Sequence, residues 1–154
     1  MTSHDKSPHD GPSHDTSPAG LLAALPFAAR LGIELSEASA GRTTAALPWS
    51  ADLCTVGGAL HGGALMTLAD TAGAVCAFLN LPPGTTTSTV ESKTNFFRPV
   101  RSGAARAVAR PLHIGRSYVV VQTEVYDAQG HAVGQTTQTQ AVREPRPGQD
   151  AAGA

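Results

Sequence analysis

The chain has 154 residues, of which 41% are hydrophobic, and its formal net charge at pH 7 is -1. This length and hydrophobic content suit one globular domain with a single buried core. The near-neutral charge does not favour nucleic acid as a partner.

The two ends of the chain have compositions typical of disordered segments. Residues 1–18 contain no apolar run, so no signal peptide is expected. A His-Asp pair recurs there every five residues, at His4, His9 and His14, and such a tract could bind a metal. The surrounding Pro, Ser and Gly provide nothing to pack, so disorder is the expectation for residues 1–19 and likewise for 144–154. These boundaries leave one folded domain at residues 20–143.

The first part of this domain favours one short helix and two extended segments. The helix is expected over residues 21–30, with Pro26 accommodated by a kink or a late start. Residues 32–49, GIELSEASAGRTTAALPW, favour two extended segments that break at Ala40 and Gly41.

A longer helix is predicted from Gly63 to Asn80, where apolar residues recur at helical spacing and form one continuous face. A membrane span over residues 59–81 would place Asp70, three glycines, two threonines and a histidine in lipid, with no basic cluster beside it. Burial under a sheet explains the same apolarity without those costs. No membrane association is therefore expected.

Residues 85–143 are rich in Thr, Val, Tyr and Phe, which favour strands, and they read as four strands. The clearest hairpin signal is at residues 127–130, and Val119, Val121 and Val125 alternate on one face of the strand before it. The whole pattern predicts an α+β fold, in which an antiparallel sheet of about six strands wraps around one long central helix.

Asp70 is the only formally charged residue between Leu53 and Val90. On the predicted helix it lies beside the main apolar stripe, on the same flank as Gly73. An unpaired buried carboxylate is costly. Asp70 is therefore either satisfied by a hydroxyl or backbone group, or it serves a reaction as base or nucleophile.

The sequence His61-Gly62-Gly63 stands where this helix begins. Two glycines there allow a bound group to come close, and free N–H groups and the helix dipole favour negative charge. Such a helix end could stabilise the negative charge that develops on a carbonyl oxygen. The alternatives are ordinary helix-start geometry for the glycines and a buried, hydrogen-bonded side chain for His61.

Three segments together resemble a hotdog-fold acyl-CoA thioesterase of the PaaI-like (phenylacetate-pathway) group. The resemblance extends over residues 30–142 and depends on the combination of the His-Gly-Gly motif, an acidic residue nine positions after the histidine, and a strand that ends in Arg-Pro. The segments are GGALHGGALMTLADTAGAVCAF, TSTVESKTNFFRPV and GRSYVVVQTEVYDAQG.

The resemblance implies a role for each matching residue. Asp70 would act as general base or nucleophile on the thioester, and the backbone N–H groups of Gly62 and Gly63 would bind the oxyanion. The hydroxyl of Thr89, supplied from the partner subunit, would orient the water or the carboxylate. The family's usual asparagine six residues before the histidine is replaced by Thr55, which removes an amide able both to donate and to accept.

The segment from Ser92 to Thr123 has six basic residues and no acidic ones, and guanidinium groups bind phosphate as a planar fork. Three of them stand at expected strand ends and are candidate ligands for the phosphates of coenzyme A; the alternative is a set of solvated strand faces. These three are Arg98, Arg101 and Arg116.

The two cysteines, Cys54 and Cys76, both lie in apolar sequence, so a reducing compartment is expected rather than a disulfide framework. Cys54 could be drawn with His61 as a thiol-imidazole pair, although nothing in the sequence places the two side chains together. The folded region has no serine-hydrolase elbow, phosphate-binding loop, dinucleotide fingerprint or zinc-ligand spacing.

The expected protein is a cytoplasmic thioesterase that hydrolyses an aromatic or short- to medium-chain acyl-CoA to the free acid and coenzyme A. It needs no metal and no cofactor, because coenzyme A is part of the substrate, and it forms a homodimer or homotetramer. The alternative is a non-catalytic acyl-CoA binding or sensing module with the same fold, which would not need Asp70. A hotdog hydratase would need a histidine within the long helix, which this sequence lacks.

Overall fold

The computed structural model describes residues 15–145. The expectations for residues 1–14 and 146–154, which include His4, His9 and His14, lie outside this range. The first helix begins at Pro18, two residues before the expected start of the domain. In chain order the elements are α1 (Pro18–Ala23), α2 (Pro26–Arg30), β1 (Glu34–Ala38), β2 (Thr43–Pro48), the 3-10 turn η1 (Ala51–Leu53), α3 (Gly62–Phe78), β3 (Thr86–Phe96), β4 (Ala104–Ile114), β5 (Tyr118–Tyr126) and β6 (Ala132–Arg143).

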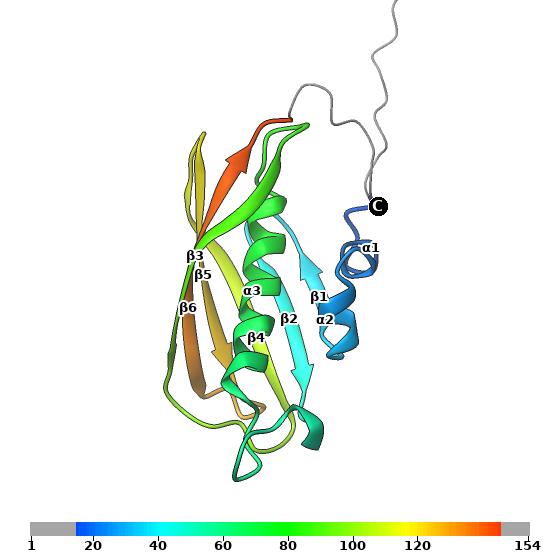
Figure 1. Ribbon diagram of the computed structural model, residues 1–154, viewed down its shortest axis with the longest axis vertical. Coiled ribbons are helices and arrows are strands. Elements are labelled where there is room, and N and C mark those ends of the chain that lie inside the picture. Colours follow the sequence, from blue (N-terminus) through cyan, green and yellow to red (C-terminus); the bar gives the residue numbers. More distant parts are fainter. Residues whose placement is uncertain (1–14, 146–154) are drawn as a thin grey trace, which may run out of the picture.

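The six strands form one antiparallel sheet in the order β1-β2-β4-β5-β6-β3. The sheet curls around α3, which runs along its inner face, and the short helices α1 and α2 lie beside β1 (Figure 1). The predicted fold, an antiparallel sheet of six strands around one long helix, is confirmed.

Small side chains bring α3 close to the sheet. Ala45 of β2 and Ala107 of β4 are fully buried, and they belong to one core with Leu68, Ala72 and Cys76 of α3. Because α3 is enclosed by strands on one side and by α1 and α2 on another, most of its surface is apolar rather than one stripe. Within residues 15–145, no helix is long and apolar enough to cross a membrane.

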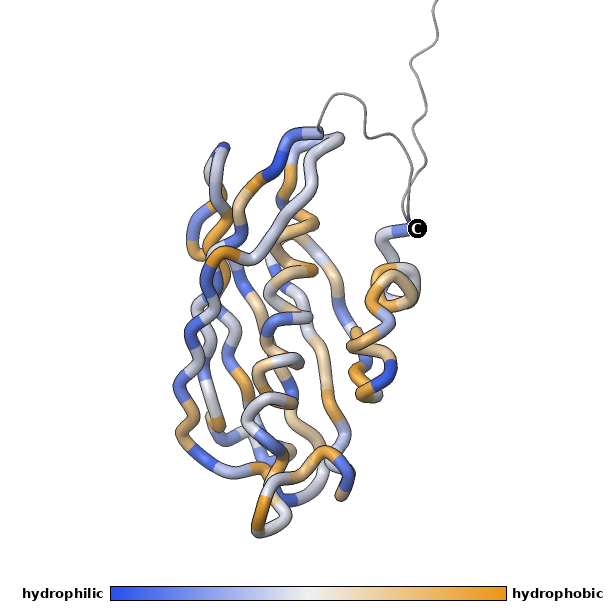
Figure 2. Tube along the Cα trace, viewed as in Figure 1, coloured by the Kyte–Doolittle hydropathy of each residue, from blue (hydrophilic) through white to orange (hydrophobic). Residues whose placement is uncertain are grey.

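The N-terminal helix differs from the expectation. Instead of one helix over residues 21–30, the chain forms α1 and α2, and Pro26 is the first residue of α2. Proline has no N–H for a helix interior but fits the first turn, and Leu25 before it adopts a non-helical conformation, with φ -120° and ψ 71°. The resulting pair of short helices carries the hydrophobic segments seen in Figure 2.

Other local predictions are confirmed. The extended segments break between Ala38 and Thr43, which are joined by a short turn. Between β5 and β6, residues 127–130 form the predicted hairpin turn, where Gly130 has φ +85°, a conformation that favours glycine. The alternating valines of β5 are all buried: Val119, Val121 and Val125.

The strand β3 lies at one edge of the sheet. Among residues 15–145 it pairs only with β6, so in this part of the chain one side of the strand, which has 11 residues, is open to another chain. Val90 and Phe96 on β3 are 52% and 50% exposed, and Met66 of α3 is 40% exposed. An open edge with apolar side chains around it is the kind of surface that a partner covers.

Candidate active site

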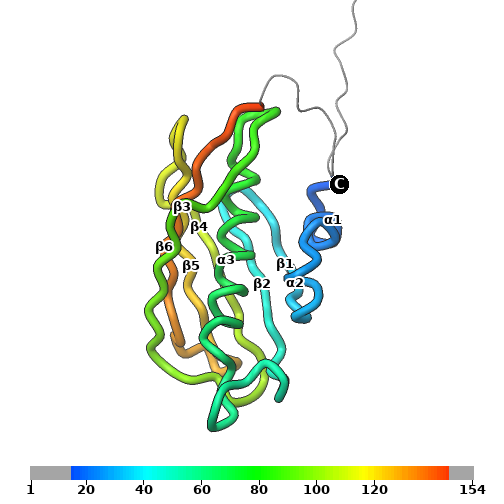
Figure 3. The backbone as a smooth tube through the Cα atoms, viewed as in Figure 1, coloured from blue at the N-terminus to red at the C-terminus, as the bar shows by residue number. Residues whose placement is uncertain are grey.

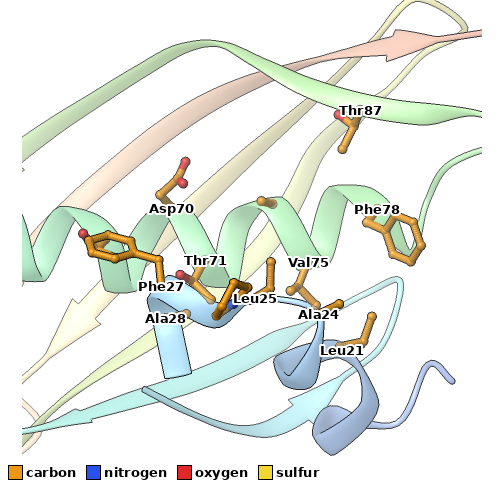
Figure 4. Close-up of a pocket in the computed structure, with 13 residues that line it drawn as sticks. Leu21, Ala24, Leu25, Phe27, Ala28, Asp70, Thr71, Val75, Phe78 and Thr87 are labelled. Carbon is orange, nitrogen blue, oxygen red and sulfur yellow. The ribbon is translucent and has the colours of Figure 1, made fainter. Parts of the chain in front are cut away.

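Asp70 lies at the middle of α3 and lines a cavity of about 480 Å³ that α3, the two short helices and Thr87 of β3 border. In Figure 4 its carboxylate lies on the side of α3 that is turned towards Thr87. Within the described chain it is the only charged residue that lines this cavity. Apart from three threonines, the other lining residues are apolar. The lining consists of Leu21, Ala24, Leu25, Pro26, Phe27, Ala28, Thr67, Asp70, Thr71, Ala74, Val75, Phe78 and Thr87.

The surroundings of the Asp70 carboxylate act on its pKa in two directions. Burial raises the pKa above its ordinary value, and a hydrogen bond from Gln138 Nε2 to Asp70 Oδ1 partly opposes that rise. No hydrogen bond to Oδ2 is found among residues 15–145. One carboxylate oxygen is thus held by the sheet, and the other can accept a proton from a molecule in the cavity.

The His-Gly-Gly motif forms the start of α3, with His61 as the N-cap (φ -60°, ψ 138°). His61 Nδ1 accepts a hydrogen bond of 2.8 Å from the Gly63 N–H. The His61 side chain is exposed, so it is not the buried histidine of the alternative interpretation. Because the Gly63 N–H is already used, the Gly62 N–H is the donor at this helix end without a partner in the described part of the chain.

Gly62 and Asp70 belong to different surroundings on the same helix. Eight residues separate them, a rise of about 12 Å along the helix axis. The start of α3 borders a second cavity of about 460 Å³, which His61 and Gly63 line, and the two cavities share Phe27 and Thr67 in their walls. Within one chain, the Gly62 N–H and the Asp70 carboxylate therefore lie at neighbouring cavities, but they are too far apart to contact the same small group.

Thr55 lies in the loop between η1 and α3, and hydrogen bonds hold this loop in place. Its N–H donates to Ala59 O over 2.8 Å, and Arg101 donates to the carbonyl of Gly57. The Thr55 side chain is exposed and lines neither cavity. In one chain, the residue at the family's asparagine position thus has no contact with Asp70.

Thr89 lies on the edge strand β3, where its hydroxyl accepts a 2.8 Å hydrogen bond from Gln140 Nε2. It is exposed and does not line the Asp70 cavity, whereas Thr87, two residues earlier on the same strand, does. Within one chain, Thr89 therefore has no contact with the site. It is placed where a partner paired with β3 would meet it.

The three candidate arginines are all exposed, but they lie at two ends of the molecule. Arg98 and Arg101 precede β4, at the end that holds the His-Gly-Gly turn, and Leu60 N donates to Val100 O between them. Arg116 lies in the turn between β4 and β5, and Figure 3 shows this turn at the opposite end of the molecule. The rise of an extended strand of this length puts it about 30 Å away. One chain does not bring the three together.

Two features of the surroundings of Asp70 were not foreseen from the sequence. The first is the wall formed by α1 and α2. The second is Gln138 on β6, which is fully buried and contacts Asp70. A signal existed for Gln138, because β6 alternates and Gln138 stands at an inward position with Thr136 and Gln140, where apolar residues are the norm.

Cys54 and His61 both line the second cavity, but no hydrogen bond joins their side chains, and the Cys54 thiol donates to Ser50 O at 3.3 Å. Within residues 15–145 no cluster of three or more His, Cys, Asp or Glu side chains could hold a metal ion.

A long helix enclosed by a six-stranded antiparallel sheet, with a carboxylate at its middle and a free N–H at its start, defines the class of hotdog-fold thioesterases. The sequence model of the thioesterase superfamily matches residues 57–133, and the chain belongs to this superfamily.

Relatives and solved structures agree with this assignment. The proofreading thioesterase EntH of Klebsiella pneumoniae is 37% identical over 66% of this chain and 74% of its own length. The 1,4-dihydroxy-2-naphthoyl-CoA hydrolase of Escherichia coli is 37% identical over 47% of this chain and 54% of its own length. The structure of a Haemophilus influenzae thioesterase has a TM-score of 0.81 and 27% identity, and covers 87% of this chain and 95% of that one.

A mutant thioesterase of Pseudomonas aeruginosa has a TM-score of 0.78 and 28% identity, over 82% of this chain and 94% of that one. The expectation of a PaaI-like hotdog thioesterase is confirmed, and the chain is a thioester hydrolase. The non-catalytic alternative is set aside.

Proposed function

We propose that the chain hydrolyses the thioester of an acyl-CoA, with Asp70 as the general base or nucleophile. The observation that carries this proposal is the position of Asp70, a lone carboxylate in the wall of an apolar cavity with one oxygen free. As a base, Asp70 takes a proton from water while the water oxygen attacks the carbonyl carbon. The carbon–sulfur bond then breaks, and the thiolate of coenzyme A leaves and takes up a proton.

The start of α3 supplies the complementary electrophilic group. In the tetrahedral intermediate the carbonyl oxygen becomes an anion, and the Gly62 N–H together with the positive end of the helix dipole stabilises it. The resemblance implied that the Gly63 N–H also binds the oxyanion. In this proposal the Gly62 N–H is the main donor, because the Gly63 N–H already donates to His61 Nδ1.

A second copy of the chain completes the site. An axial separation of about 12 Å is too long for Gly62 and Asp70 of one chain to act on one carbonyl group. If two α3 helices pack antiparallel, Asp70 of one approaches Gly62 of the other. The open edge of β3 and the exposed Val90, Met66 and Phe96 support a homodimer, or a tetramer built from such dimers. In this assembly Thr89 reaches the partner's site.

The cavity beside Asp70 accepts the acyl group. Its volume of about 480 Å³ and its wall of Leu, Ala, Val and Phe side chains suit an aromatic or a short- to medium-chain acyl group. The similarity to a naphthoyl-CoA hydrolase supports an aromatic one. The nucleotide of coenzyme A would bind Arg98 and Arg101 at the His-Gly-Gly end. Two free cysteines support a cytoplasmic location.

A panel of acyl-CoA substrates, assayed with a thiol-detecting reagent, tests this function. Aromatic and short- to medium-chain thioesters should release coenzyme A at rates well above the uncatalysed reaction, and long-chain thioesters should react poorly because the cavity cannot hold them. Hydrolysis that does not depend on the acyl group would overturn the assignment of the cavity, and a lack of release from every thioester would overturn the proposed function.

Mixed dimers test whether the site is shared. Asp70→Asn and Gly62→Pro chains are each expected to be inactive, but a dimer with one of each retains one site in which both groups are intact. After complete subunit exchange at equal concentrations, about a quarter of the wild-type activity should return, since half of the dimers are mixed and each has one working site. The pair Asp70→Asn and Thr89→Ala tests Thr89 in the same way. Verified exchange without recovery would show that each chain holds its own site.

A further inference from the structure

Gln138 is a buried polar residue whose presence does not serve the stability of the core. Its side chain is fully buried on β6, and its Nε2 donates to Asp70 Oδ1. Its Oε1 has no hydrogen-bond partner among the described residues, and neither has the buried hydroxyl of Thr123. A buried amide with an unpaired oxygen costs free energy that an apolar side chain of the same size would not.

Gly73 makes the contact between Gln138 and Asp70 possible. It lies three residues after Asp70 on the same flank of α3. A Cβ at position 73 would overlap Gln138 Oε1 and come within 3.3 Å of Thr123 Oγ1. A glycine in the middle of a helix is less favourable than alanine. Two unfavourable features, a mid-helix glycine and a half-satisfied buried amide, thus together permit one hydrogen bond to the carboxylate.

We propose that Gln138 is a positioning residue for the hydrolysis, which holds Asp70 Oδ1 so that Oδ2 points into the acyl cavity as an ionised group. This inference rests on the proposed function of Asp70. Gln138 does not line the cavity, so it acts on the substrate only through Asp70. Because the hydrogen bond favours the charged carboxylate, it counteracts the effect of burial and keeps the base ionised over a wider range of pH.

Of the groups around Asp70, Gln138 has the largest polar effect on the pKa of its carboxyl. From α1 and α2 the cavity receives only apolar side chains, and β3 contributes Thr87. The remaining polar neighbours are Thr67 and Thr71 on α3 itself. No charged side chain other than Asp70 lines this cavity within residues 15–145, so the titration of Asp70 reports on burial and on Gln138.

The test compares Gln138→Met with Thr136→Val in the full chain. Methionine keeps the length of the side chain and removes the donor. Thr136 is buried two residues earlier on the same strand and bonds Thr94 rather than Asp70, so its substitution is a matched control for the loss of a buried polar group. Gln138→Met should lower kcat about tenfold with KM nearly unchanged, and it should move the acid limb of the pH–rate profile to higher pH.

The thermal midpoint of Gln138→Met should stay close to that of the wild type, because removal of an unpaired buried oxygen offsets the loss of the hydrogen bond to Asp70. Thr136→Val should leave the pH profile where it is. Gly73→Ala should reproduce the effects of Gln138→Met on kcat and on the acid limb, since the added methyl group displaces the amide. In a Gln138→Ala background the same Gly73→Ala change should add little to either effect.

A titration of the Asp70 carboxyl carbon by NMR, assigned with Asp70→Asn, needs no substrate. In Gln138→Met the pKa of Asp70 should rise above that of the wild type. An unchanged pKa and an unchanged acid limb would overturn the inference, and so would a lower thermal midpoint with wild-type pH dependence, which is what a purely structural residue gives. If Gln138→Met shifts the pKa while Asp70→Asn keeps full activity, the proposed function of Asp70 fails instead.

Discussion

The first turn and the middle of α3 present opposite chemistry on one helix. The first turn begins with two glycines, of which Gly62 is half-buried and Gly63 exposed, and the Gly62 N–H has no partner among the described residues at the positive end of the helix dipole. The middle borders the cavity beneath α1 and α2 and contacts β6, and it carries a half-buried carboxylate whose pKa is raised by burial. In the proposed function, the electrophilic group and the base thus occupy environments that strengthen each of them.

The difference is also the reason that the proposed function requires a second copy of the chain. A helix rises about 1.5 Å per residue, so two groups eight residues apart cannot meet across one carbonyl group. Two helices packed antiparallel exchange their ends and middles, which converts this separation into two equivalent sites. The predictions below separate the contribution of the helix start from that of the helix middle.

The largest expected effect is at the middle of the helix. Asp70→Asn keeps the volume and the hydrogen bond from Gln138, but it removes the base, so kcat should fall by a factor of about a hundred or more. Circular dichroism and the thermal midpoint should show a folded protein. Turnover at the wild-type rate would contradict the role of Asp70 in either form, base or nucleophile.

The next effect is at the helix start, where proline can remove a single donor. Gly62 is the first helical residue, a position that proline tolerates, and His61 before it already has the extended conformation that a following proline requires. Gly62→Pro should therefore fold and lower kcat about a hundredfold through loss of the N–H.

Gly62→Ala is the matched control for this change. It retains the N–H and brings a Cβ equally close to Phe96, at 3.2 Å from its ring, so it should remain far more active than Gly62→Pro. Equal losses in the two variants would assign the effect to contact with Phe96 and not to the oxyanion donor.

The sequence predicts the parts of this site that depend on local pattern. The presence of the helix α3, the alternation of β5 and the turn at residues 127–130 each depend on neighbours a few residues away, and each is confirmed. Asp70 was conspicuous because it is a single charge in an apolar helix. The prediction of a single helix through Pro26 is wrong, because a proline begins a new helix more readily than it is accommodated within one.

Contacts between residues far apart in the sequence could not be predicted from local sequence patterns. Gln138 meets Asp70 across 68 positions of sequence, and the register of β6 against the sheet decides which of its inward residues reaches the helix. The arginines show the same limit. Their places at strand ends could be foreseen, but the direction of β4 puts Arg116 at the far end from Arg98 and Arg101.

The arginines at the His-Gly-Gly end give a smaller effect, mainly on binding. Arg98→Ala should raise KM about tenfold to a hundredfold with little change in kcat, since a phosphate contact is the same in the ground and transition states. Added salt should reduce the difference. Arg116→Ala should leave KM unchanged, because Arg116 lies at the other end of the molecule from Arg98 and Arg101.

A truncated thioester without the nucleotide separates binding from structure. Wild type and Arg98→Ala should hydrolyse it equally, whereas Arg101→Ala should lose activity on it as well, because Arg101 also holds the loop at Gly57. Loss of activity on the truncated substrate in Arg98→Ala would remove the phosphate assignment for that residue.

The smallest effect is on stability, and it depends on pH through Asp70. Because burial raises the pKa of this carboxyl above 3.8, the folded chain holds the proton more tightly than the unfolded chain. Below the ordinary pKa the carboxyl is protonated in both states, and burying it as a charge costs nothing. As the pH rises through the raised pKa, the free energy of unfolding decreases, because the folded chain must then bury the ionised carboxylate. Asp70→Asn does not ionise, so its thermal midpoint should exceed that of the wild type at pH 7, and the two midpoints should converge as the pH falls towards 3.8.

The measured quantity is the difference in thermal midpoint between the two proteins at each pH, because the effects of the other carboxylates on stability are the same in both proteins and cancel. If the difference in thermal midpoint between the two proteins is the same at every pH, the pKa of Asp70 is the same in the folded and unfolded chains. Burial in the middle of α3 would then not raise the pKa of the proposed base.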